Sequence, residues 1–186
     1  MKLIGTTGKP ASGKTVTAKK IAEQLDCPIF EMGDIVTERV SKYVGKSKSS
    51  LTSDEKGTAA TELREEYGET VFAEATLEKA LNCGSEYVVV SGIRTPEEIN
   101  VFDSGSDFTL VLVEADFETR YQRFVSRGRE DEGDFTRNDF EKRNEREMNW
   151  GLDKVLSEEL YDVSIQNASS VDVLTSKVSD FVKTVQ

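Results

Sequence analysis

The sequence predicts an α/β fold, in which short apolar strands alternate with amphipathic helices around one core. The chain begins with an apolar run from Leu3 to Thr6, then a glycine-rich turn, then a helical stripe of apolar residues. Residues 86–91 (EYVVVS) form a β-branched run that is typical of a strand buried on both faces of a sheet. A chain of 186 residues has room for one substantial core, so we expect a single domain over residues 1–186.

The glycine-rich turn carries a phosphate-binding pattern. Its residues are Gly8, Lys9, Pro10, Ala11, Ser12, Gly13, Lys14 and Thr15, which fit G-x-x-x-x-G-K-[ST], the P-loop pattern. The glycines let successive N–H groups face one anion, and the positive end of the next helix points at the same spot. We expect Lys14 to reach the β- and γ-phosphates of ATP and the Thr15 hydroxyl to ligate Mg²⁺. A plain turn before an ordinary helix is the alternative, and the flanking strand and helix argue against it.

A second short strand at 28–32 is followed by Gly33-Asp34 and another helix. Asp34 has two interpretations that we keep open. It is either the N-cap of the helix or a carboxylate at the carboxyl end of a strand, facing the phosphate site. One side chain can do both.

The middle of the chain contains the residues that we expect to bind a phosphate acceptor. Residues 45–66 contain a polar connection and a helix start, and we expect them to form an acceptor-binding insertion. Arg64 is the only arginine of this insertion, and a solvated helix face explains it better than a substrate phosphate does. Arg94 follows the carboxyl end of the strand at 86–91, where α/β sheets bind ligands, and its planar guanidinium suits a phosphate.

Arginines gather in residues 117–149, which we interpret as a lid that closes over a bound nucleotide. Arg123 and Arg127 are four residues apart on one predicted helix face, and we favour phosphate contacts for both. For Arg120 and Arg146 we prefer an i,i+4 lattice of salt bridges with the many Glu residues.

The last segments of the chain complete the predicted alternation of strands and helices. The polar run 130–134 is expected to be the mobile tip of the lid. Residues 161–166 (YDVSIQ) predict a final strand, and the apolar spacing over 171–185 predicts a C-terminal helix.

Composition excludes several classes of protein. The net charge of −11, with 35 acidic against 24 basic residues, argues against broad nucleic-acid binding. No run approaches the roughly 18 apolar residues that span a bilayer, and no apolar signal region precedes the first strand, so we expect a cytosolic location away from membranes. Cys27 and Cys83 are too far apart for a metal knuckle, and the sequence has no His. We expect both cysteines to be at least half-buried. The oligomeric state stays open.

The order of these parts resembles nucleoside monophosphate kinases and dephospho-coenzyme A kinase, and most closely an archaeal family of P-loop kinase-like proteins. The segments MGD, ELREEYG, SGIR and RNEREMNWG are similar to recurring blocks of that family. The resemblance covers the whole chain and implies a three-layer fold, with a parallel five-stranded sheet between helices and a helical lid. It also implies ATP and Mg²⁺ as cofactors and a small acceptor that bears a phosphate or a hydroxyl.

Carried over by position, the resemblance implies roles for seven residues. Asp34 falls at the acceptor site, and Arg94 is similar to the arginine that grips the acceptor phosphate. Arg123 and Arg127 resemble the lid pair, one beside the adenine and one on the phosphates. Asn167 falls where related kinases approach the adenine with a loop. A second lid pair is implied at Arg129 and Arg143.

Two departures from the kinase pattern bear on catalysis. Thr37 stands where adenylate kinases place an arginine for the acceptor phosphate. Ser91 stands where the kinases carry an acidic residue that holds Mg²⁺ through water, so that duty passes to Asp34 or is lost. If it is lost, the alternative is an ATP- or GTP-binding switch protein with weak hydrolysis and a macromolecular partner. The favoured function is an ATP-dependent phosphotransferase whose expected catalytic residues are Lys14, Asp34, Arg94 and Arg127.

Overall fold

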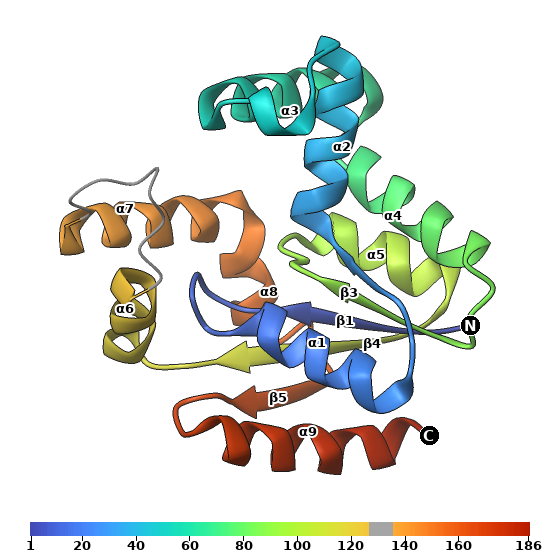
Figure 1. Ribbon diagram of the computed structural model, residues 1–186, viewed down its shortest axis with the longest axis vertical. Helices are drawn as coiled ribbons and strands as arrows, with labels where there is room; N and C mark the ends of the chain where they lie inside the picture. The colour runs from blue at the N-terminus through green and yellow to red at the C-terminus, as the bar shows by residue number, and fades with distance from the viewer. Residues whose placement is uncertain (127–135) are drawn as a thin grey trace.

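A computed structural model describes residues 1–126 and 136–186 of the chain. Within these residues a parallel sheet of five strands, in the order β2-β3-β1-β4-β5, lies between two layers of helices (Figure 1). The strands are β1 (Lys2–Thr7), β2 (Ile29–Glu31), β3 (Tyr87–Ser91), β4 (Asp107–Glu114) and β5 (Val163–Gln166). The structure thus confirms the three-layer α/β fold.

Helices connect the strands, as a parallel sheet requires. The α-helices of the described residues are α1 (Lys14–Leu25), α2 (Met32–Val44), α3 (Ser53–Tyr67), α4 (Val71–Asn82), α5 (Pro96–Gly105), α6 (Phe117–Ser126), α7 (Arg137–Glu147), α8 (Asp153–Ser157) and α9 (Val171–Val185). A 3₁₀ turn, η1, spans Lys48–Ser50, and a π-helical segment, η3, spans Met148–Leu152. Hydroxyl side chains accept a bond from a backbone N–H of the first turn in four helices, at Thr52, Thr95, Thr136 and Ser170.

The two faces of the sheet carry separate apolar clusters because side chains alternate along each strand. Ile4 and Val89 point to the face that α1 and α9 cover. Leu3 and Val88 point to the other face, which packs against α4, α5 and α8 (Figure 1). The central strands are therefore buried on both sides, as the run at 86–91 predicts.

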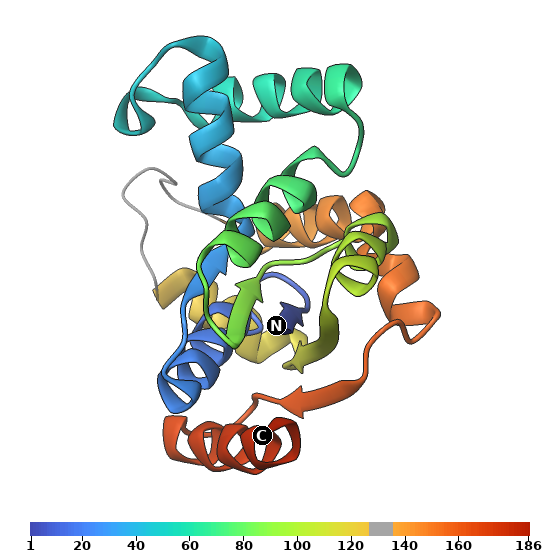
Figure 2. The same ribbon diagram turned by 90° about the vertical axis from the view of Figure 1, so that its right-hand side faces the viewer.

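Two helical extensions project beyond the sheet (Figures 1 and 2). One is formed by α2, η1 and α3 and contains the predicted insertion at 45–66. Ala59 and Leu63 of α3 are buried in the same apolar cluster as Leu3 of the sheet. The other extension is formed by α6 and α7, within the predicted lid. No helix among the described residues has the length and apolar character needed to cross a membrane.

Replacement of Phe102 by Ala should lower the free energy of unfolding by about 3–5 kcal/mol, because it leaves a cavity in the core. Phe102 is fully buried and stacks on Phe108, with ring centroids 5.8 Å apart. Leu81→Ala is the matched control, since this side chain is 53% exposed, and it should change stability by only about 0.5 kcal/mol. Urea unfolding measures both variants. Equal losses would contradict this description of the core.

Candidate nucleotide-binding site

The P-loop joins β1 to α1 at the carboxyl edge of the sheet (Figure 1). Three of its residues have left-handed backbone angles, with φ of 142° at Gly8, 60° at Ala11 and 97° at Gly13. A Cβ at Gly8 would overlap the carbonyl oxygen of Val113, and one at Gly13 would overlap Nδ2 of Asn167. Only glycine fits at both positions. This backbone curls the loop as an anion-binding nest requires.

Lys14 lies over the loop. Its Nζ donates to the Gly8 carbonyl oxygen at 2.9 Å and to the Lys9 carbonyl oxygen at 3.3 Å. The amine is therefore held inside the loop, where phosphate oxygens can replace the carbonyls. Gly13 is the N-cap of α1 and, in the described part of the chain, no side chain caps the helix. The positive end of α1 is thus open to an anion.

Thr15 lies at the start of α1, next to the end of β2. Its Oγ1 is 3.5 Å from Oε2 of Glu31, whose Oε1 lies 3.7 Å from Nζ of Lys19. In residues 1–126 and 136–186, no three Cys, Asp or Glu side chains gather as a metal cluster does. A metal ion at Thr15 would therefore depend on ligands from a bound phosphate, as Mg²⁺ usually does.

Arg123 and Asn167, which we expect to lie near the nucleotide, both donate hydrogen bonds to the P-loop. Nη1 of Arg123 donates to the Ser12 carbonyl oxygen at 3.2 Å, and its Nη2 donates to the Asn167 carbonyl oxygen at 2.8 Å. Nδ2 of Asn167 donates to the same Ser12 oxygen at 2.8 Å. The structure thus brings α6 and the connection after β5 together at the P-loop. Contact of either residue with a nucleotide stays a prediction.

The preferred interpretation of Arg120, a surface lattice of salt bridges, is wrong. Its side chain is buried, with 3% exposed. Nη1 donates to the Pro10 carbonyl oxygen at 3.1 Å and to Oδ1 of Asn144 at 2.8 Å, and Nε donates to the Ala115 carbonyl oxygen at 3.2 Å. Burial lowers the pKa of the guanidinium. Arg120 is therefore a buried residue of α6 that links α7 to the P-loop through its hydrogen bonds to Asn144 and Pro10.

The spacing of aromatic residues in α6 contains the signal that locates Arg120. Phe117, Tyr121 and Phe124 contact the fully buried Phe140 of α7, with ring centroids 5.0–5.8 Å apart. Positions 117, 120, 121 and 124 follow the i, i+3, i+4, i+7 pattern of one helix face. Arg120 therefore belongs to the inward stripe of α6.

Several lid predictions lie outside the described residues. They concern Arg127, Arg129 and the tip at 130–134. Arg143 is described: its Nε lies 3.8 Å from Oε1 of Glu147, and its guanidinium lies over the Phe124 ring. Arg146 is exposed.

The expected acceptor arginine, Arg94, lines a cavity of about 540 Å³ between α3, the β3–α5 connection and residues 149–154. Arg64 of α3 and the exposed Trp150 line the same cavity. Nε of Arg94 is 3.4 Å from Oε2 of the buried Glu147. The volume suits a small-molecule ligand.

The cavity is attached to the P-loop through the backbone. The N–H groups of Gly92 and Ile93 donate to the Thr6 carbonyl oxygen at 3.0 and 3.2 Å. Oγ1 of Thr7 donates to the Ile93 carbonyl oxygen at 2.8 Å. Arg94 therefore follows directly on residues that are bonded to the end of β1, where the P-loop begins.

Asp34 is not the N-cap of its helix. α2 begins at Met32 with Glu31 as its N-cap, so Asp34 lies exposed in the first turn. The helix starts early because β2 runs into it without an intervening turn. Asp34 does not line the cavity around Arg94, and its acceptor role stays a prediction.

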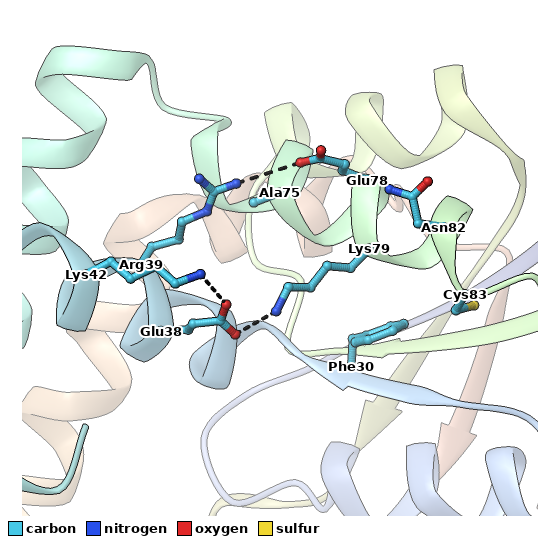
Figure 3. A pocket seen from close by; sticks show the side chains of 9 residues that line it. All are labelled: Phe30, Glu38, Arg39, Lys42, Ala75, Glu78, Lys79, Asn82 and Cys83. Carbon is cyan, nitrogen blue, oxygen red and sulfur yellow. Dashed lines mark hydrogen bonds and ion pairs between the residues drawn. The ribbon is translucent and has the colours of Figure 1, made fainter. Parts of the chain in front are cut away.

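A second cavity of about 440 Å³ lies between α2 and α4 (Figure 3). Glu38 accepts from Nζ of Lys42 at 2.9 Å and from Nζ of Lys79 at 2.6 Å, and these lysines lower its pKa to about 2. Arg39 lies 3.9 Å from Glu78 across the cavity. These pairs join α2 to α4, and we assign no ligand to this cavity. Cys83 at its edge is exposed, contrary to the expectation from sequence.

Comparisons with known proteins support the P-loop assignment. Residues 4–151 match the AAA_18 family, which is described as an AAA domain. The chain is 36% identical over 179 residues to a UPF0200 protein of Methanoculleus marisnigri, and the match covers 96% of this chain and 93% of that protein.

Solved structures of kinases share the fold. A gluconokinase from Sinorhizobium meliloti superposes with a TM-score of 0.61 at 17% identity, covering 99% of this chain and 93% of the other. A shikimate kinase from Acinetobacter baumannii in complex with shikimate superposes with a TM-score of 0.57 at 13% identity, covering 99% and 92%. At these identities the likeness concerns the fold.

Arg120→Ala should weaken ATP binding by about tenfold, because an interaction of this kind is worth about 1–3 kcal/mol and its loss leaves the Pro10 carbonyl without its guanidinium donor. Calorimetric titration with ATP measures the change. Arg146→Ala is the matched control, since Arg146 lies exposed in the same lid, and it should leave affinity unchanged. If Arg120→Ala binds ATP like the parent, the buried arginine does not shape the loop.

The pH dependence of stability should reveal the buried Glu98 beside Arg94. Glu98 is 8% exposed and accepts from the Arg94 N–H at 2.8 Å. Burial raises its pKa above the ordinary value of 4.5, with partial compensation from Arg94. The folded state therefore binds the proton more tightly than the unfolded state does. Its contribution to stability is present below pH 4.5 and is lost as pH rises toward the folded-state pKa.

Glu98→Gln tests this dependence, because Gln still accepts the bond from Arg94 and does not titrate. The free energy of unfolding of the parent minus that of the variant should fall between pH 4 and pH 7. Urea unfolding at each pH gives both values. A difference that is flat or rises with pH contradicts the raised pKa.

Proposed function

The chain belongs to the AAA_18 family of AAA domains and to the archaeal UPF0200 proteins, and we propose that it is an ATP-dependent phosphotransferase. Its acceptor is a nucleotide or a nucleotide-like small molecule that bears a phosphate or a hydroxyl. One observation carries the proposal. Lys14 lies over the P-loop, and backbone hydrogen bonds join the end of β1, where this loop begins, to the segment that leads into Arg94 and its cavity.

The P-loop residues bind the donor. Lys14 exchanges its carbonyl partners for the β- and γ-phosphates, and the open end of α1 adds its positive dipole. The Thr15 hydroxyl is a hard oxygen donor next to a carboxylate, so the residues present fit Mg²⁺. Bound Mg²⁺ neutralises charge on the phosphate oxygens. Arg123, and Arg127 beyond the described residues, supply further positive charge from the lid.

The acceptor enters over Asp34 and Arg94. Phosphoryl transfer requires little covalent chemistry from the protein, so position and charge neutralisation dominate. Arg64, Arg94 and Lys154 line one cavity together with the acidic residues Glu65, Glu69, Glu97, Glu98 and Asp153. The guanidinium groups of Arg94 and Arg64 are the groups there that suit a phosphate of the acceptor. If the acceptor is an alcohol, Asp34 orients the hydroxyl or accepts its proton, whereas a phosphate acceptor needs no base.

A nucleotide-dependent switch with weak hydrolysis is the second candidate. The observation that favours it is Ser91, a short hydroxyl at the carboxyl end of β3 where the related kinases carry an acid. The lid and the Arg94 cavity favour the phosphotransferase.

Lys14→Ala should reduce ATP affinity by at least a hundredfold, because it removes the side-chain cation from the nest. Calorimetry measures affinity, and circular dichroism checks that the variant is folded. Lys20→Ala, on the outer part of α1, is the control and should bind ATP normally. Unchanged affinity in Lys14→Ala would refute the P-loop assignment.

Incubation with ATP and Mg²⁺ should give acceptor-dependent release of ADP with one member of a panel. The panel contains nucleoside monophosphates, dephospho-coenzyme A, gluconate and shikimate, and mass spectrometry detects the phosphorylated product. Arg94→Ala should abolish transfer and leave ATP affinity unchanged. Hydrolysis that no acceptor stimulates would favour the switch instead.

A further inference from the structure

A row of polar side chains crosses the carboxyl edge of the sheet. Glu31 of β2 is in register with Ser91 of β3, which is in register with Thr6 of β1. Residues in register on neighbouring parallel strands point to the same face. Two positions earlier, Ile4 and Val89 pack with α1, so the polar row also points to the face that α1 covers.

Glu31, at one end of this row, lies beside the residue that would ligate the metal. That residue is Thr15, the second residue of α1, and its Oγ1 lies 3.5 Å from Oε2 of Glu31. Nζ of Lys19 lies 3.7 Å from the other oxygen of this carboxylate, Oε1. The sequence lacks a carboxylate at position 91 but has one on the adjacent strand, about 4.8 Å away. The side chain of Glu is long enough to cover that offset.

Two hydroxyl groups, one at the end of β1 and one in the P-loop, are buried without hydrogen-bond partners among the described residues. Oγ1 of Thr6 and Oγ of Ser12 have no hydrogen-bond partner in the described part of the chain, and both residues are fully buried. Thr6 belongs to the polar row, and Ser12 belongs to the P-loop. Buried hydroxyls are normally hydrogen-bonded, so these two indicate that a polar ligand or ordered water belongs there.

We propose that Glu31 supplies the carboxylate that holds the water shell of Mg²⁺ on the bound nucleotide, in place of an acid at position 91. The inference depends on the proposed binding of ATP with Mg²⁺ at the P-loop. Glu31 acts as a positioning residue: it accepts hydrogen bonds from metal-bound water beside Thr15. Mg²⁺ commonly retains several waters and uses few protein carboxylates, which agrees with a single acid here.

The test is the gain in nucleotide affinity that Mg²⁺ provides. ADP and a non-hydrolysable ATP analogue are titrated calorimetrically into the full chain, once with Mg²⁺ and once with EDTA. Glu31→Gln should reduce the gain by about tenfold, as expected when an outer partner of a metal site is lost. Its affinity in EDTA should equal that of the parent, because Gln keeps the size of the side chain and its contact with Thr15.

A second variant makes the test specific to position 91. Ser91→Asp in the Glu31→Gln background should restore the gain, since it returns the acid to the neighbouring strand on the same face. Mn²⁺ bound with the nucleotide gives an independent readout, because its electron paramagnetic resonance spectrum changes with the water shell. Glu23→Gln, on the exposed side of α1, should behave like the parent.

Three results would overturn the inference. The first is an unchanged Mg²⁺ gain in Glu31→Gln, and the second is an equal loss of affinity with and without Mg²⁺. The third is a loss of the gain in Asp34→Asn but not in Glu31→Gln. If the parent chain binds no nucleotide with or without Mg²⁺, the proposed function fails instead, and the titration of the parent identifies that case.

Discussion

A loop that turns its N–H groups toward an anion has to turn its carbonyls elsewhere, and buried carbonyls need donors. The rest of the site depends on this constraint. Lys14 donates to two carbonyls at the start of the loop, Arg120 donates to Pro10, and Arg123 and Asn167 donate to Ser12. These donors come from α1, α6 and the connection after β5. The P-loop is therefore shaped by segments more than a hundred residues away in sequence.

The alternation of side chains along the strands organises the chemistry as well as the core. The same two-residue period that separates the two apolar clusters places Thr6, Ser91 and Glu31 on one face at the carboxyl edge. On this face, each strand carries apolar residues in the middle of the sheet and a polar residue at its carboxyl edge. The apolar core and the polar row at the carboxyl edge thus follow from one periodicity.

Much of this could be predicted from the sequence. The P-loop, the buried strand at 86–91 and the final helix have local signals, and the resemblance to kinases supplied the five-stranded sheet. Arg120 was misjudged because an arginine in an acidic chain usually lies at the surface, whereas here it shares the inward face of α6 with aromatic residues. The start of α2 was misplaced because Gly33 resembles a turn, although the backbone is already helical at Met32.

Glu31 illustrates what a single sequence does not contain. Its closeness to Thr15 depends on the pairing of β2 with β3 and on the tilt of α1 across them, neither of which is encoded in a short motif. The cavity around Arg94 is a second example, because α3, the β3–α5 connection and residues 149–154 all contribute to its lining. Contacts between segments that are remote in sequence require the fold.

The carbonyl oxygen of Ser12 accepts hydrogen bonds from two side chains that lie far apart in sequence. One donor is Arg123 of α6, and the other is Asn167 in the connection after β5. If Arg123 moved away, the carbonyl oxygen of Ser12 would keep the Asn167 amide as a donor. The shape of the loop at Ser12 therefore does not depend on the arginine alone.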